Sequence, residues 1–299
     1  MIGPTASGKT ALAIKLADIL NGEIISADSR QVYKKMDIGT GKDLSSYYNN
    51  GKKIRCHLID IHESGYKYNV YEYQKDFYKI YKELTQRKVY PILCGGSGLY
   101  IQAVLQQYNL IHVPINQKLR NSLINKSLFE LKTILEKYKK LHNNTDTDTT
   151  KRAIRAIEIA AYYQVNNSIK TSCPIFNHVL FGIQHDRQTL KKKITQRLIQ
   201  RIDNGMITEV KDLLNTGLKP EDLIYYGLEY KYITLYLLNM LSYDEMISKL
   251  NIAIHQFAKR QMTWFRRMER NNLPINWIDG SLPLDEKVQK VLQVLEKSK

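Results

Sequence analysis

Residues 3–10 read GPTASGKT and have the residue types and the spacing that bind phosphate. They fit the pattern G-x-x-x-x-G-K-[ST] at every fixed position. The two glycines let the backbone turn tightly and expose N–H groups, which cradle a di- or triphosphate together with the positive end of a following helix. Lys9 adds a point charge for the terminal phosphates, and the Thr10 hydroxyl can ligate Mg²⁺. The predicted phosphate-binding residues are Gly3, Pro4, Thr5, Ala6, Ser7, Gly8, Lys9 and Thr10.

A second chemical group follows the next predicted strand. Ile24 and Ile25 indicate a short buried strand, and Asp28 stands just past its C-terminal end. Ligands of open α/β sheets bind at that edge. Asp28 could ligate Mg²⁺, cap the next helix or act as a base. Gln31, on the turn that follows, could hydrogen-bond an adenine edge or be a solvated loop residue.

The elements that must position these residues alternate between strands and helices. Apolar residues at 12, 16 and 20 predict a helix after the phosphate loop, and helical spacing recurs over 71–87. Only Met1 and Ile2 precede the loop, so its strand is either shortened or begins upstream. Further strands are predicted at 54–61, 178–184 and 275–279, and residues 89–100 are predicted to form a buried strand that runs into a second Gly-rich turn. The alternation predicts an α/β fold, with a P-loop NTPase-like parallel sheet flanked by helices.

The alternation of strands and helices stops between residues 112 and 172, where no strand is evident. We therefore expect a core in two parts, 1–111 and 173–299, the second with C-terminal helices, and a helical insertion domain over 112–172. Asp148 or Thr149 is a plausible cap for one of its helices. Ser242 with Glu245 forms a capping box that predicts a long helix in the second part.

The charge points to a polyanionic partner. Lys and Arg number 45 against 29 Asp and Glu, a net charge of +16. Nucleic acid is the usual partner of such an excess, although a Lys-rich composition of the whole proteome would also produce it. Two clusters favour nucleic acid: KRAIR at 151–155, and 258–270, where basic residues alternate with Trp264 and Phe265. Charge for phosphates beside flat rings for bases is typical of single-stranded nucleic-acid binding.

Other classes of protein are excluded by composition. No run of 18 apolar residues occurs, so we expect no membrane span. The cysteines Cys56, Cys94 and Cys173 are widely spaced, which fits neither a disulfide framework nor a zinc site. A cytoplasmic location follows as the expectation.

Taken in order, the motifs resemble those of the tRNA dimethylallyltransferases, also called the IPP transferase family. The resemblance covers nearly the whole chain. It is found in GPTASGKT, ISADSRQVYKKMDIGTGK, HLIDI, PILCGGSGLYI, KRAIRAIE, ITQRLIQRIDNGMITEV and AKRQMTWFRR. The eukaryotic C-terminal zinc finger does not follow, which implies a bacterial-type enzyme.

The resemblance implies a reaction. A dimethylallyl group would pass from dimethylallyl diphosphate to the N6 amine of the adenosine 3′-adjacent to the anticodon, in tRNAs that read codons starting with U. The phosphate loop would hold the diphosphate, and Thr10 would bind Mg²⁺. Asp28 would be the base, while Arg197 and Lys9 would stabilise the departing diphosphate. We expect a monomer without a membrane partner.

The resemblance also implies which residues contact the tRNA anticodon stem-loop. They are Asp28, Ser29, Arg30, Gln31, Ser97, Arg120, Lys151, Arg152, Arg155, Lys259, Arg260, Gln261, Trp264 and Arg266. Ser97 replaces the usual Thr of the family and keeps the hydroxyl.

Three alternatives are less well supported by the sequence. A P-loop kinase of a small metabolite would explain residues 1–42 but leaves the basic and aromatic segment unused. An adenylate isopentenyltransferase acting on free nucleotides needs no extended basic surface. A non-catalytic RNA-binding protein would not need intact Lys9, Thr10, Asp28 and Arg197.

Overall fold

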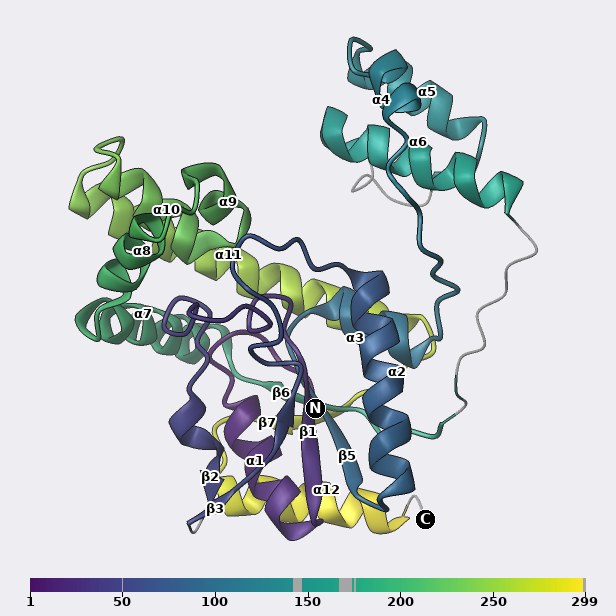
Figure 1. Cartoon of the computed structure of the whole chain (residues 1–299). Helices are drawn as coiled ribbons and strands as arrows, with labels where there is room; N and C mark the ends of the chain where they lie inside the picture. Colours follow the sequence, from purple (N-terminus) through teal and green to yellow (C-terminus); the bar gives the residue numbers. More distant parts are fainter. Residues whose placement is uncertain (50, 142–146, 167–173, 175, 298–299) are drawn as a thin grey trace. The chain divides into compact units, whose positions relative to one another are not determined.

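The computed structural model describes residues 1–49, 51–141, 147–166, 174 and 176–297. The chain divides into a larger unit, residues 1–108 with 174–299, and a smaller helical unit, residues 109–173 (Figure 1). The helical insertion predicted from the sequence spans residues 112–172.

The larger unit is built on a parallel sheet. Its strands are β1 (Gly22–Ala27), β4 (Cys56–His57), β5 (Tyr90–Gly95), β6 (Phe181–Gln184) and β7 (Asn276–Asp279). They form two parallel groups, β4-β1-β5 and β6-β7. Ile2 joins the groups, because it forms parallel bridges with Gly95 and with Gly182. Within this chain, Ile2 therefore occupies the strand position that precedes the phosphate loop.

The prediction of a strand over 54–61 is wrong in length. Only Cys56 and His57 pair with β1. Leu58 and Asp60 have positive φ angles, of 61° and 54°, which are incompatible with an extended strand. The polar segment before it contains a 3-10 helix (Leu44–Tyr47) and an antiparallel pair of short strands, β2 (Tyr48–Asn49) and β3 (Lys52–Lys53).

Helices cover both faces of the sheet. Those of the larger unit are α1 (Lys9–Ile19), α2 (Val70–Gln86), α3 (Gly98–Leu105), α7 (Arg187–Asp203), α8 (Met206–Asn215), α9 (Pro220–Tyr225), α10 (Leu228–Leu237), α11 (Tyr243–Arg270) and α12 (Leu284–Lys297). Within the described residues, none of the helices is both long enough and apolar enough to cross a membrane.

Consecutive residues of β1 are buried on opposite faces, which is why parallel strands read as continuous apolar runs. Ile24 packs in a cluster with Leu12 of α1 and Val291 of α12. Ile25 packs in the other cluster, with Phe77 of α2 and Leu198 of α7. The sheet therefore lies between an α1–α12 layer and a larger layer of the remaining helices.

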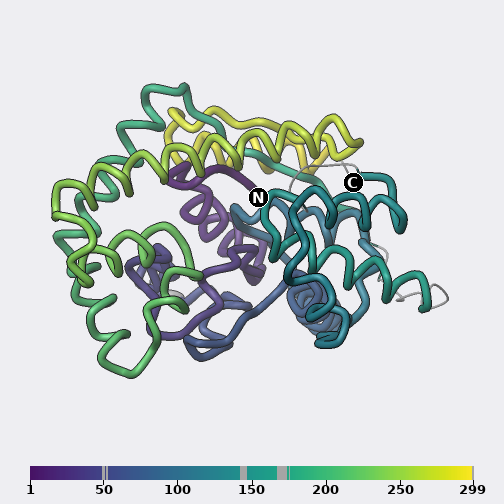
Figure 2. The backbone as a smooth tube through the Cα atoms, turned by 90° about the horizontal axis from the view of Figure 1, so that it is seen from above, coloured from purple at the N-terminus to yellow at the C-terminus, as the bar shows by residue number. Residues whose placement is uncertain are grey.

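The longest helix, α11, runs along one side of the larger unit as a single unbroken element (Figure 2). The predicted capping box is confirmed: Ser242 accepts from the Glu245 amide, and the Glu245 carboxylate accepts from the Ser242 amide. Its buried stripe includes Leu250, Ile254 and Phe265. With 28 residues, α11 is long enough to extend from its capped N-terminus to the phosphate loop.

The smaller unit consists of α4 (Gln117–Leu123), α5 (Leu128–Glu136) and α6 (Thr150–Val165). Its core includes Leu131 and Leu135 of α5 against Ala153 and Ile157 of α6. Thr149 caps α6 by accepting from the Arg152 amide, so the second of the two predicted caps is the one used.

Candidate functional site

The phosphate loop lies between the bridging residue Ile2 and the start of α1. Gly8 caps α1 with φ 85°, a conformation that side chains disfavour, so glycine is required at this position. The first amides of α1 have no partner inside the helix and carry its positive dipole end. Lys9 folds back on the loop, and its Nζ donates to the Pro4 carbonyl at 3.3 Å. The loop thus has the form of an anion-binding turn.

Arg197 reaches this loop from α7, where its Nη2 donates to the Thr5 hydroxyl. Burial, aided by the neighbouring Arg201, lowers the pKa of Arg197 to about 9. Burial also lowers the pKa of Lys9. Cations that burial destabilises gain most from a bound anion, which would restore favourable solvation. Lys9 and Arg197 therefore give the loop the electrostatic character of an anion-binding site.

An acidic side chain offsets part of the positive charge of these cations. Glu229 of α10 lies 3.5 Å from Arg201, and burial raises the pKa of the Glu229 carboxyl. Glu229 was not singled out from the sequence, because its partner is 28 residues away and no local pattern links them.

Asp28 lies at the end of β1, as predicted. Its Oδ1 accepts from the Arg30 amide at 2.9 Å. Burial lowers the pKa of Lys9 and of Arg197, and the charge of Asp28 opposes a small part of that lowering, so the carboxylate lies within electrostatic reach of the phosphate loop. A carboxylate and an anion-binding loop therefore meet at one edge of the sheet.

Ser29 and Ser97 connect the ends of β1 and β5. The Ser29 amide donates to Ser97 Oγ at 3.0 Å, and the two hydroxyls lie 3.3 Å apart. Arg30 lies over the ring of Tyr225 at 5.3 Å. Gln31 donates through Nε2 to the carbonyls of Thr40 and Gly41, at 3.4 Å and 3.2 Å. These contacts fix the segment that follows Asp28, and the loop up to residue 42 holds Gln31.

The loop that ends at residue 42 is held in place by residues that could not be singled out from the sequence. Glu209 of α8 accepts from the amides of Asp37, Ile38 and Gly39, at 2.6–3.0 Å, and from the Tyr230 hydroxyl at 2.7 Å. Lys42, buried in the same loop, donates to Asp37 at 2.6 Å and to Asp60. The sequence separation between Glu209 and the loop amides, about 170 residues, leaves no local signal.

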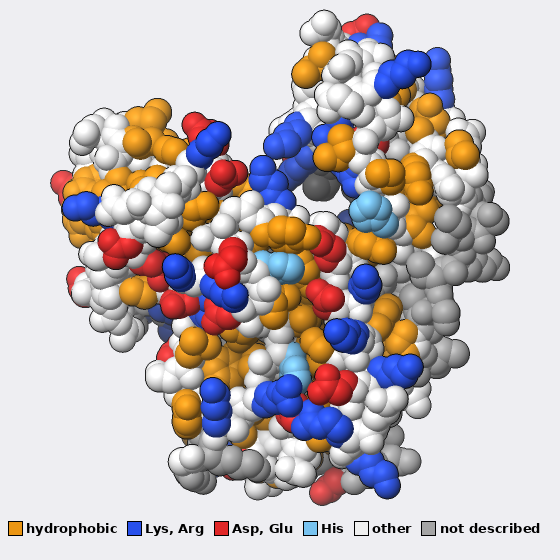
Figure 3. Space-filling view, in the orientation of Figure 1, with side chains coloured by type: hydrophobic (Ala, Val, Ile, Leu, Met, Phe, Trp, Pro, Cys, Tyr) orange, Lys and Arg blue, Asp and Glu red, His pale blue; other side chains and the backbone are white. Residues whose placement is uncertain are grey.

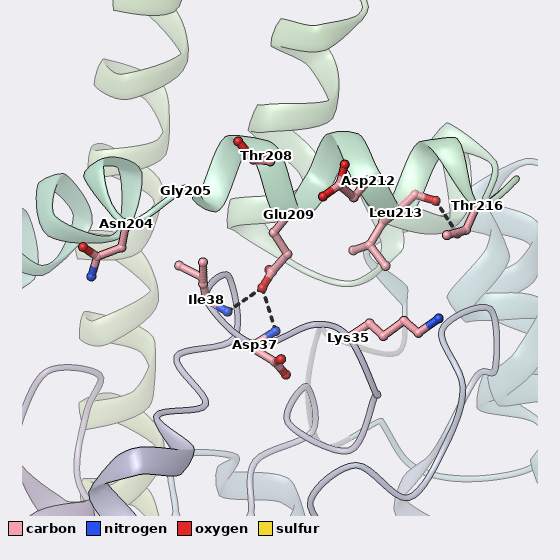
Figure 4. A pocket seen from close by; sticks show the side chains of 10 residues that line it. All are labelled: Lys35, Asp37, Ile38, Asn204, Gly205, Thr208, Glu209, Asp212, Leu213 and Thr216. Atoms are coloured by element: carbon pink, nitrogen blue, oxygen red, sulfur yellow. Dashed lines mark hydrogen bonds between the residues drawn. The ribbon is translucent and has the colours of Figure 1, made fainter.

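A hollow of about 550 Å³ lies beside these contacts (Figure 4). It is lined by residues of the loop and of α8, among them Lys35, Asp37, Thr208, Glu209 and Asp212. The Glu209 carboxylate points at the loop backbone rather than into open space (Figure 4). We therefore assign Glu209 to holding the loop, and none of the predicted site residues lines this hollow.

The basic end of α11 presents two kinds of residue. Lys259, Arg260 and Arg266 are exposed. Trp264 is half-buried, and its Nε1 donates to Gln102 of α3 at 3.0 Å. Gln261 differs from them, since it is only 7% exposed and its amide is bonded to the protein at both ends. The structure thus gives Gln261 an internal role in place of an exposed one.

The predicted basic residues of the smaller unit are partly neutralised within it. Arg120 binds Glu158 through two bonds of 2.9 Å and 2.7 Å, and Arg155 also contacts this carboxylate. Burial alone would raise the pKa of Glu158, but the hydrogen bonds from these arginines outweigh it and lower that pKa to about 2. Arg152 pairs with Asp148 at 2.5 Å, and Lys151 is exposed.

Figure 3 shows how charged side chains are distributed on one face of the protein. On the face shown in Figure 3, basic and acidic side chains are interspersed over the larger unit. The excess of +16 is therefore not gathered into one patch on that face.

A metal ion would find few protein ligands here. The described residues contain no group of three or more His, Cys, Asp or Glu side chains that could hold one. Thr10, half-buried at the start of α1, offers one hydroxyl. Such a donor set fits Mg²⁺ completed by substrate phosphate oxygens and water, the usual arrangement for this ion.

The comparisons with known proteins agree with one another. The family model described as IPP transferase matches residues 31–268. The chain is 58% identical over 295 residues to tRNA dimethylallyltransferase 1 of Parabacteroides distasonis, covering 99% of this chain and 96% of the relative. It is 57% identical over 296 residues to tRNA dimethylallyltransferase 2 of Bacteroides fragilis, covering 99% and 97%.

Among solved structures, the tRNA isopentenylpyrophosphate transferase of Bacillus halodurans matches with a TM-score of 0.72 at 31% identity, covering 99% of this chain and 94% of that one. The enzyme of the same name from Staphylococcus epidermidis matches with a TM-score of 0.70 at 29% identity, covering 100% and 98%. The P-loop NTPase-like fold predicted from the sequence is confirmed.

Proposed function

The chain belongs to the IPP transferase family of tRNA dimethylallyltransferases. We propose which role each of its site residues has in the transfer of the dimethylallyl group. The substrates are dimethylallyl diphosphate and the anticodon stem-loop of a tRNA. The observation that supports this most strongly is the meeting of Lys9 and Arg197, two cations whose pKa values burial lowers, with the Asp28 carboxylate at one edge of the sheet.

The transfer forms one bond and breaks another. The bond between the dimethylallyl C1 and the bridging oxygen of the diphosphate breaks, and its electron pair leaves with the diphosphate. The N6 amine of the adenosine 3′-adjacent to the anticodon forms the new bond to C1. The proton that the amine loses must be accepted by a base.

The phosphate loop and Arg197 stabilise the leaving group. Negative charge grows on the diphosphate as it departs, and preorganised donors in a buried site favour that state over the ground state. Arg197 already touches the loop through Thr5, so its guanidinium stands at the site before substrate arrives. Thr10 would hold Mg²⁺, which supplies further charge neutralisation of the diphosphate when bound.

Asp28 accepts the proton. Its place at the carboxyl end of β1, beside Ser29 and Ser97, puts a carboxylate next to the diphosphate site. A positioned general base contributes about 10²–10⁴ to the rate. Gln31, held by the carbonyls of Thr40 and Gly41, stands close by in sequence and would contact the target base.

The RNA surface includes the exposed end of α11. Lys259, Arg260 and Arg266 supply charge for phosphates, and Trp264 supplies a ring against which a base can stack. Flipping an adenosine out of a loop costs less free energy than flipping it out of a duplex. This suits an enzyme whose reacting groups lie at the edge of a sheet. In the smaller unit, Arg120, Lys151, Arg152 and Arg155 would contact the RNA as well. We further propose a monomer that works in the cytoplasm.

A transfer assay with radiolabelled dimethylallyl diphosphate tests this function. The acceptors are an anticodon stem-loop with three consecutive adenosines and, as control, free AMP. Label in the stem-loop alone is expected. Label in AMP would instead indicate an enzyme of free nucleotides, and turnover of ATP without label in either acceptor would indicate a kinase.

A further inference from the structure

We propose that Gln261 of α11 is a positioning residue that fixes the conformation of the phosphate loop, and that it does not contact RNA. The inference rests on the proposed diphosphate-binding function of residues 3–10. It concerns a residue whose neighbours in sequence, Arg260 and Met262, give no hint of such a role.

The side-chain amide of Gln261 joins two loops. Its Oε1 accepts from the Thr5 amide at 2.9 Å. Its Nε2 donates to the Gly96 carbonyl, also at 2.9 Å. Only an amide offers both an acceptor and a donor at the same carbon, so neither Glu as a carboxylate nor Lys can make both bonds.

The loop after β5 is shaped to admit this side chain. A Cβ built on Gly96 would lie 2.4 Å from Gln261 Nε2 and 3.5 Å from the Gly3 carbonyl oxygen. Glycine at 96 therefore leaves the space that the amide fills. One turn further along α11, the bond from Trp264 to Gln102 ties the same helix to α3. The helix is thereby anchored at Gln261 and again one turn beyond it.

Thr5 lies between two helices from the second part of the core. Its amide is held by Gln261 of α11, and its hydroxyl is held by Arg197 of α7. Loss of the first contact would free the Thr5 backbone and disturb the second. Since catalytic groups must be held within about 0.5 Å of their working positions, a looser Thr5 would weaken both diphosphate binding and Arg197 placement.

The contacts also exclude Gln261 from the RNA surface. The side chain is 7% exposed, and both ends of its amide are hydrogen-bonded to backbone atoms. To reach RNA it would have to abandon the half-buried Thr5 amide and the buried Gly96 carbonyl, and a buried polar group left unpaired costs about 1–3 kcal/mol.

The experiment compares Gln261→Ala and Gln261→Met with Gln256→Ala, a glutamine exposed on the same helix. For each variant, KM for dimethylallyl diphosphate, KM for the stem-loop and kcat are measured separately. Gln261→Ala is expected to raise KM for dimethylallyl diphosphate about tenfold, the effect of one lost buried hydrogen bond. It is also expected to lower kcat and to leave KM for the stem-loop within about twofold.

Gln261→Met keeps the length of the side chain and loses both hydrogen bonds of the amide, so the same rise in KM for dimethylallyl diphosphate and the same fall in kcat are expected. This variant retains the size of the side chain and keeps the test valid if Gln261→Ala fails to fold. Gln256→Ala is expected to match the unsubstituted protein. A rise in KM for the stem-loop alone, or no change in any parameter, would overturn the proposal.

Calorimetric titration with inorganic diphosphate separates this proposal from the function on which it rests. Gln261→Ala is expected to weaken diphosphate binding even if the chain acts on another diphosphate compound. Unchanged diphosphate affinity in Gln261→Ala would contradict the positioning role. Absence of diphosphate binding in the unsubstituted protein would instead contradict the phosphate-site function.

Discussion

Arg197 donates a hydrogen bond to the hydroxyl of Thr5, a residue 192 positions earlier in the chain. This contact brings a guanidinium from α7 onto the phosphate loop and sets it beside Lys9. A bound diphosphate would receive both charges without rearrangement of the helix.

Replacement of Arg197 by Ala is therefore expected to lower kcat by about 10²–10³, the usual cost of removing one preorganised donor from a developing anion. Affinity for the stem-loop should stay within about twofold, because Arg197 faces the phosphate loop. Single-turnover transfer and filter binding measure the two quantities. A variant that loses RNA affinity and keeps its rate would place Arg197 on the RNA surface instead.

Asp28 is expected to act on the proton alone. Asp28→Asn keeps the oxygen that accepts from the Arg30 amide at 2.9 Å, so the turn should be preserved. The transfer rate should fall by about 10² or more, the contribution of a general base. Filter binding should show unchanged stem-loop affinity. Loss of binding together with rate would show that Asp28 holds the RNA and does not serve as the base.

Arg260 is expected to contribute a phosphate contact. Arg260→Ala should weaken stem-loop binding and reduce the slope of log K against log salt by about one. Lys249→Ala is a matched control, since Lys249 is an exposed cation on the same helix that pairs with Glu245. Equal slopes in all three proteins would make the basic end of α11 a solvated surface.

Glu209 is expected to act through the loop that it holds. Glu209→Ala leaves three backbone amides without their acceptor, which should lower the free energy of unfolding by about 2–4 kcal/mol. Stem-loop kcat/KM should fall as well, because the same loop fixes Gln31. Urea denaturation and steady-state kinetics measure the two effects.

The control for Glu209 is Asp212→Ala, an exposed acid on the same helix that lines the same hollow. It should change stability by no more than about 0.5 kcal/mol. If Glu209→Ala were as stable as this control, the loop would not depend on Glu209.

Features with a local signal were predictable from the sequence. The spacing of Gly3, Gly8 and Lys9 specifies the phosphate loop, and Ser242 with Glu245 specifies the start of α11. The apolar pattern around Ile24 and Ile25 specifies β1, which leaves Asp28 at the edge of the sheet. In each case the physical cause lies within a few residues.

Features that depend on distant partners were not predictable in this way. Gln261 stands among basic and aromatic residues, and only the fold shows that it faces Thr5, 256 positions away. Glu209 reads as an ordinary acid of an amphipathic helix. The early end of β4 follows from the positive φ angles of Leu58 and Asp60, residue types that usually avoid this conformation.

The central claim is that the phosphate loop of this chain holds the diphosphate of a prenyl donor, and calorimetric titration of dimethylallyl diphosphate tests it most directly. Saturable binding is expected, with competition by inorganic diphosphate and a loss of at least about tenfold in Lys9→Ala, where one charge at the loop is removed. Tight binding and hydrolysis of ATP, with no heat from dimethylallyl diphosphate, would contradict it.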